Sequence, residues 1–189
     1  MTCEQIRLGD WLLEVDIEAT RRAYLGARPI DLCGCQGCHN YSALASAFSG
    51  DLLAFFQWFG MDPAKEAEVF VYCQDRAGLH FYGGFYHLVA RIREQPDPLS
   101  FFSVTEQFWV SFTQKTSLVP NDFPQPVLQM EIQAALPWVL KQPSLYETTT
   151  TPVRVPMGLV RAENGRITER VEGTLSQDEQ DSPNAKTVD

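Results

Sequence analysis

Hydrophobic and polar positions follow a helical period before residue 60 of this chain and a strand period after residue 68. Two short apolar runs, Ile6–Leu8 and Trp11–Val15, flank the dipeptide Gly9-Asp10 and predict a β-hairpin, because glycine supplies the positive φ of a two-residue turn. Asp16 is expected to cap the following helix, in which Ile17, Thr20, Arg21 and Tyr24 have helical spacing and which should end near Gly26. Two further helices are expected, one capped by Asn40 and one over residues 52–59.

Four longer segments beyond residue 68 predict strands. Val69–Cys73 is continuously apolar, which is typical of a central strand covered on both faces. Residues 79–92 form the returning strand, in which Gly83-Gly84 predicts a bulge or the close approach of another backbone. Phe102–Thr113 and Leu128–Leu136 alternate between apolar and polar residues. We therefore predict an α+β fold: an antiparallel meander of about four long strands and an N-terminal hairpin, packed against N-terminal helices.

The domain organisation follows from the loss of this pattern beyond residue 141. Residues 1–160 are expected to form a single α+β domain. Residues 161–189 are expected to be a mostly disordered acidic tail, since from Gly173 onward they are Ser, Gln, Asp, Glu, Asn and Pro with almost no large apolar side chain.

Charge and composition exclude several classes of partner. The 189 residues carry a formal net charge of −9, and Lys and Arg are scattered singly or in pairs. We therefore expect no nucleic-acid partner and no binding to an anionic membrane, because both need concentrated positive charge. No apolar run is long enough to span a bilayer, and the first ten residues lack the apolar core of a secretion signal. A cytoplasmic protein with reduced thiols is expected.

The chemically distinctive segment is Asp31-Leu-Cys-Gly-Cys-Gln-Gly-Cys-His-Asn40, in which Cys33, Cys35 and Cys38 lie within six residues. Thiolates so close in sequence can converge on one metal ion, and the Cys35–Cys38 spacing is that of a zinc knuckle. The second Cys-x-x-Cys half of a full zinc motif is missing. The same cysteines could instead be reactive thiols, or could belong to an inert structural loop.

A tetrahedral zinc site needs a fourth ligand, which the spacing leaves open. Cys73 and His80 are candidates, since a symmetric turn between them would place them opposite each other on a hairpin. His87 is another, although seven residues beyond His80 it should lie on the other face of a regular strand. His39 is less suitable because it adjoins Cys38. Each of these residues also fits an ordinary core position.

Two motifs together resemble a known family. The run Cys33-Gly-Cys-x-x-Cys-x-Asn40 and the run Tyr82-Gly-Gly-Phe-Tyr-His87 resemble those of a family of small, uncharacterised bacterial proteins, mostly from Gram-positive anaerobes. The resemblance covers Ile6 to about Leu140. It implies that His87 joins Cys33, Cys35 and Cys38 as the fourth metal ligand. It implies no activity, because none is established for the family.

We therefore expect a non-catalytic binding or interaction domain, in which zinc held by Cys33, Cys35, Cys38 and His87 fixes the cysteine loop. Its partner would be an unknown protein or small molecule, and an acidic surface suits a basic protein. The alternative is an enzyme that uses the same cluster, as an open zinc site with bound water or as a thiol nucleophile. No acid–base pair or nucleotide-binding motif accompanies the cysteines.

Overall fold

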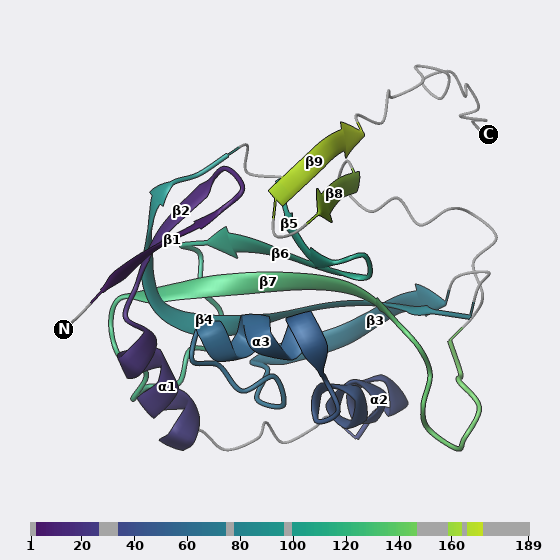
Figure 1. The fold of residues 1–189 in the computed structure, drawn as a ribbon. Helices are drawn as coiled ribbons and strands as arrows, with labels where there is room; N and C mark the ends of the chain where they lie inside the picture. The colour runs from purple at the N-terminus through teal and green to yellow at the C-terminus, as the bar shows by residue number, and fades with distance from the viewer. Residues whose placement is uncertain are drawn as a thin grey trace, which may run out of the picture.

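The computed structural model describes residues 3–26, 34–74, 78–96, 100–146, 159–163 and 166–171. Within these ranges the chain is an α+β protein with three helices and a seven-stranded antiparallel sheet, which confirms the fold class but not the expected number of strands (Figure 1). In chain order the elements are β1 (Glu4–Leu8), β2 (Trp11–Val15), α1 (Ile17–Gly26), α2 (Gln36–Ala45), α3 (Gly50–Trp58), β3 (Glu68–Gln74), β4 (His80–Glu94), β5 (Phe102–Thr105), β6 (Phe108–Thr113), β7 (Val127–Leu136), β8 (Leu159–Glu163) and β9 (Arg166–Val171).

The strand order differs from a meander. The sheet runs β1-β2-β4-β7-β6-β5, and β3 pairs with β4 beside this path. The long strand β4 pairs with β3 through its first half and with β2 through its second half. The segment expected as one strand, residues 102–113, is two strands, because the Thr105 side chain accepts a hydrogen bond from the Gln107 amide and closes a turn. The last long strand, β7, lies between β4 and β6 in the sheet.

The N-terminal expectations are confirmed in detail. β1 and β2 form a hairpin whose last pair is Leu8 and Trp11, with Gly9 at a φ of 57°. Asp16 caps α1, since its carboxylate accepts a hydrogen bond of 2.9 Å from the Ala19 amide. The described helix runs from Ile17 to Gly26, and the residues that directly follow lie outside the described part of the chain.

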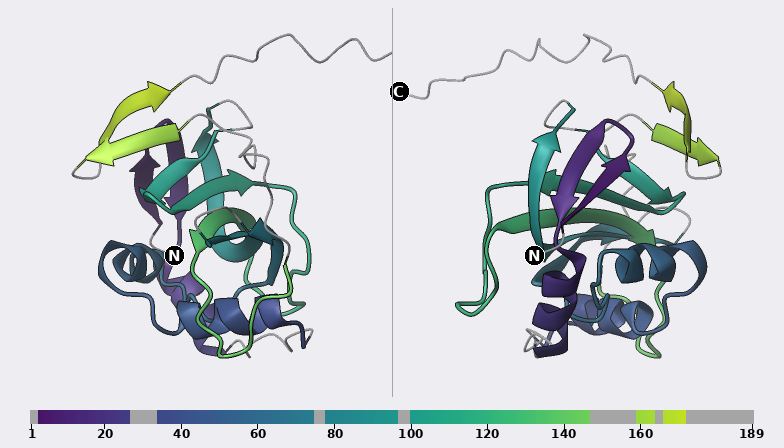
Figure 2. Two further views of the ribbon diagram at one scale, coloured as in Figure 1. Left: turned by 90° about the vertical axis from the view of Figure 1, so that its right-hand side faces the viewer. Right: turned by 60° about the vertical axis from the view of Figure 1, so that its left-hand side comes forward.

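All three helices lie on the same side of the sheet, as both views in Figure 2 show. The core forms between them and alternate residues of the strands, including Tyr82 and Tyr86 of β4 and Phe108 of β6. Phe56 of α3 is fully buried at the centre, with its ring centroid 5.0 Å from that of Tyr86 and 5.8 Å from that of Phe108. This packing leaves the other face of the sheet without a helix among the described residues.

The prediction that residues 69–73 form a central strand is wrong. β3 pairs with β4 and with no other strand in the described part of the chain. Its apolar run is continuous because the inward side chains reach the core while Phe70 and Tyr72 form an aromatic pair on the outer face, 40% and 58% exposed. An apolar run alone does not distinguish these two arrangements.

The described C-terminal segments are the strands of one hairpin, β8 and β9. It overlaps the start of the region expected to be disordered, and the rest of that predicted tail, from residue 172, lies outside the described residues. Among the described helices none combines the length and the hydropathy needed to cross a bilayer.

Candidate functional site

Cys35 and Cys38 lie at the N-terminus of α2, where their sulfur atoms are 3.3 Å apart. Cys35 is the N-cap residue, with extended backbone angles, and its sulfur accepts a hydrogen bond of 3.4 Å from the Cys38 amide. The prediction that Asn40 caps this helix is wrong, because Cys35 takes that role and Asn40 lies within the helix. The helix thus begins inside the cysteine motif and turns its two thiols together.

The two thiols differ in exposure. Cys35 is exposed, whereas Cys38 is buried and its thiol lies 3.5 Å from the Val69 carbonyl oxygen of β3. A molecule arriving from solvent would therefore meet Cys35 first. The positive end of the α2 dipole also favours negative charge on sulfur at this place.

A strap of residues 137–146, which follows β7, returns over the cysteine helix. Asn40, fully buried, holds it there: its side-chain amide donates to the Tyr82 hydroxyl (2.8 Å) and to the Pro137 carbonyl (3.0 Å). Its side-chain oxygen accepts a hydrogen bond of 2.7 Å from the Val139 amide. Asn40 therefore ties together α2, β4 and the strap.

The end of the strap reaches the cysteines through Tyr146. Its hydroxyl hydrogen-bonds both the Cys35 side chain and the Gly37 backbone. A Cβ atom on Gly37 would lie only 2.6 Å from this oxygen, so glycine is needed here for the close approach. Burial raises the pKa of the Tyr146 hydroxyl, and the neighbouring Cys35 adds to this effect. Burial likewise raises the pKa of Tyr82 to about 12. Both phenols are therefore hydrogen-bond donors at neutral pH.

His80 helps to hold the strap against the sheet. Its Nε2 atom is 2.6 Å from the Ser144 hydroxyl, and its ring centroid lies 4.7 Å from that of Trp138. The expectation that Cys73 faces His80 across the hairpin is wrong, because the register shifts between Val71 and Cys73 and pairs Cys73 with Phe81. The extra residue on β3 is a bulge that the apolar pattern did not reveal.

His87 lies on the other face of β4. The pairing of β4 with β7 is unbroken through Gly83-Gly84, so side chains keep alternating, and His87 faces away from Tyr82 and Tyr86. Its Nε2 atom is 2.9 Å from the Ser117 carbonyl oxygen, and burial lowers its pKa. The glycines instead allow the predicted close approach, since a Cβ on Gly84 would lie 2.4 Å from the Glu68 carbonyl oxygen.

The structure thus brings Cys35 and Cys38 together and places the His87 ring on the opposite face of the sheet. Cys33 lies outside the described residues. Within the described ranges no group of three or more His, Cys, Asp or Glu side chains is arranged to hold a metal ion. Sequence reasoning named Asn40 only as a helix cap and a motif residue, and it did not predict the contributions of Ser144 and Tyr146. The one available signal was Gly37, a glycine between two cysteines.

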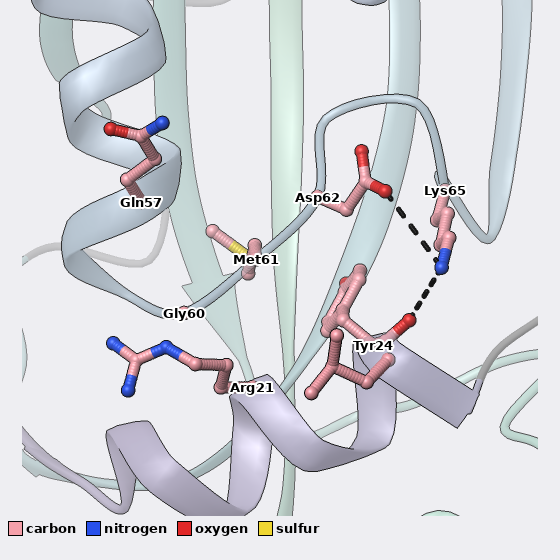
Figure 3. Close-up of a pocket in the computed structure, with 8 residues that line it drawn as sticks. Arg21, Tyr24, Gln57, Gly60, Met61, Asp62 and Lys65 are labelled. Atoms are coloured by element: carbon pink, nitrogen blue, oxygen red, sulfur yellow. Dashed lines mark hydrogen bonds and ion pairs between the residues drawn. The ribbon is translucent and has the colours of Figure 1, made fainter.

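A separate hollow of about 310 Å³ lies between α1 and the segment that follows α3 (Figure 3). Its two cations are already engaged: Lys65 donates to the Tyr24 carbonyl at 2.6 Å and lies 3.8 Å from Asp62, while Arg21 pairs with Glu18. These contacts fasten the C-terminus of α1 to the loop before β3. We assign the hollow a structural role.

Comparison with known proteins found no relative of this chain: it matches no protein-family model, no curated protein and no solved structure.

Proposed function

We propose that Cys35 and Cys38 form a thiol–disulfide exchange site. The observation that supports it is the 3.3 Å separation of the two sulfur atoms at the N-terminus of α2, with one thiol exposed and the other buried. A disulfide bond needs about 2.05 Å between sulfurs, so a small side-chain movement suffices. The exposed thiol would react with a partner, and the buried thiol would complete the exchange.

The reaction is a two-electron exchange with a disulfide-bearing molecule. The Cys35 thiolate attacks one sulfur of that disulfide, forms a mixed disulfide and releases the first thiolate. The Cys38 thiolate then attacks the Cys35 sulfur, releases the second thiolate and leaves a Cys35–Cys38 disulfide. The partner is reduced to two thiols, which take up two protons, and the protein loses two electrons and two protons.

The test is to equilibrate the protein with mixtures of oxidised and reduced glutathione, quench with acid and map the disulfides by peptide mass. We expect a Cys35–Cys38 disulfide in the wild type. Cys38→Ser should accumulate a mixed disulfide with glutathione at Cys35, while Cys35→Ser should not. Cys3→Ser, which changes an exposed cysteine on the N-terminal side of β1, is the matched control and should behave as wild type. A disulfide that joins other cysteines, or none at any ratio, would contradict the proposal.

Zinc binding is the second candidate, and the closeness of the same two sulfurs favours it. Cys33, Cys35 and Cys38 would bind the ion as thiolates and fix the loop in a non-catalytic binding domain. His87 suits this role poorly because its ring is directed to Ser117. Elemental analysis of the purified protein separates the candidates: one zinc per chain, released by Cys35→Ser and protecting the thiols from oxidation, would replace the exchange reaction with a metal site.

A further inference from the structure

The face of the sheet that none of the described helices covers presents aromatic side chains to solvent. Phe70 and Tyr72 of β3 meet edge to face, with ring centroids 4.9 Å apart. Phe81 of β4 and Trp109 of β6 are half-buried and nearly parallel, with centroids 6.4 Å apart and an interplanar angle of 12°. We call these four residues the aromatic face.

The register places Phe70 and Trp109 in the same row of the sheet. Phe70 pairs with Gly83, Gly83 with Gln133 and Gln133 with Trp109, so these positions form one row across four strands. Figure 1 shows β3 running along the first half of β4. A Cβ on Gly83 would lie 2.8 Å from ring atoms of both Phe70 and Tyr72, which means that the two rings rest on this glycine. The aromatic face is therefore a packed surface and not a set of loose side chains.

The charge on this surface has one sign. The neighbouring row contains Glu68 and Glu131, which both pair with Phe85. Burial raises the pKa of the Tyr72 phenol, and the negative charge of Glu131 raises it further. β3, β5, β6 and β7 contain no Lys or Arg, and β4 contains none before Arg91.

Exposed aromatic rings beside carboxylates are suited to a cation, because a guanidinium group stacks on a ring face and also binds a carboxylate. We propose that the aromatic face, with Glu68 and Glu131, is a docking surface for an arginine-bearing segment of a basic partner protein. Charge complementarity selects this occupant. A second copy of the chain carries the same charge of −9, and the residues after 172 include four Asp or Glu and only one Lys.

The surface is distinct from the thiol site. Its residues point away from the helices, whereas Cys35 and Cys38 lie at the N-terminus of α2 on the other side of β3. Binding here is expected to be independent of the oxidation state of those cysteines.

The experiment measures the affinity of the full chain for a fluorescent oligoarginine peptide by anisotropy at several salt concentrations, with oligolysine and oligoglutamate for comparison. Oligoarginine should bind more tightly than oligolysine, and oligoglutamate should not bind. Tyr72→Ala should weaken oligoarginine binding by about three- to tenfold through loss of the cation–π contact. Trp58→Ala, which removes a similarly exposed aromatic ring from α3, should change it less than twofold.

Two variants with equal charge distinguish this surface from diffuse attraction. Glu131→Gln and Glu4→Gln each remove one negative charge, but Glu4 lies on β1 at the other edge of the sheet. We expect a several-fold loss for Glu131→Gln alone. Equal losses for both variants would falsify the proposal, as would equal binding of arginine and lysine peptides. Dimers that Tyr72→Ala dissociates would also overturn it, since a second copy would then occupy the surface.

Discussion

Replacing Gly37 by alanine tests how closely the strap contacts the cysteine helix. The new Cβ would lie 2.6 Å from the Tyr146 hydroxyl oxygen and 2.7 Å from a methyl carbon of Val71. Both distances are shorter than real Cβ contacts, so these neighbours must move, which costs about 1–3 kcal/mol. Alanine also favours the helix over glycine by at most about 1 kcal/mol. The net expectation is a loss of about 0–3 kcal/mol in the free energy of unfolding.

The clash can be isolated with a background in which both contacts are removed. In the double variant Tyr146→Phe/Val71→Ala the hydroxyl and the methyl group are absent, and the nearest remaining ring carbon lies 3.3 Å from the new Cβ. There Gly37→Ala should be neutral or stabilising by up to about 1 kcal/mol. Urea denaturation of the four proteins gives a coupling free energy, expected to be about 1–3 kcal/mol.

A second measurement connects the same change to the thiols. If the added methyl group displaces Tyr146, Cys35 should react faster with iodoacetamide in the Gly37→Ala variant than in the wild type. The reasoning would be refuted if Gly37→Ala had the same effect on stability in both backgrounds, because Tyr146 and Val71 would then not be packed on residue 37.

Three other residues give predictions of different kinds. Glu66→Gln should raise the melting temperature at pH 7 but not near pH 4. Burial raises the pKa of Glu66, so the wild type loses stability as the pH rises above about 4.5, the pKa in the unfolded chain, and glutamine removes this loss. His87→Gln should reduce the loss of melting temperature between pH 7 and pH 5. Burial lowers the pKa of His87, so the wild type loses stability as the pH falls below about 6.5, the pKa in the unfolded chain, whereas glutamine does not titrate and can still donate a hydrogen bond to the Ser117 carbonyl. Asn40→Ala removes three hydrogen bonds and should lower the free energy of unfolding, measured by urea denaturation, by about 2–4 kcal/mol. Cys35 should also be alkylated faster in this variant, and an unchanged alkylation rate would mean that the strap does not depend on Asn40.

Local signals in the sequence predicted local structure well. The Gly9-Asp10 turn, the Asp16 cap and the alternation in β7 depend on residues close together in the chain, and all three features are present. The wrong predictions concern strands whose position depends on residues that are far away in the sequence. The exposure of β3 depends on Phe70 and Tyr72 resting on Gly83, and the position of β7 between β4 and β6 depends on pairing across the whole domain.

The candidate site shows the same difference between local contacts, which the sequence predicted, and contacts between remote segments, which it did not. The Cys-x-x-Cys spacing predicted that Cys35 and Cys38 meet, since residues three apart are neighbours on the surface of a helix. The residue that contacts this pair from far along the chain is Tyr146, which carries no recognisable motif. The alternation of β4 already argued against His87 joining the cysteines, and the unbroken register supports that argument over the family resemblance.

The strap also sets the order in which the site is completed during synthesis. Cys35 and Cys38 emerge from the ribosome long before Tyr146 and before β7, to which the strap is attached. Because domains build non-local contacts late, an incomplete chain would expose the thiols without the contact of Tyr146. The nascent protein is therefore more open to oxidation than the finished one, and its cysteines acquire their final surroundings only when the last strand of the core is in place.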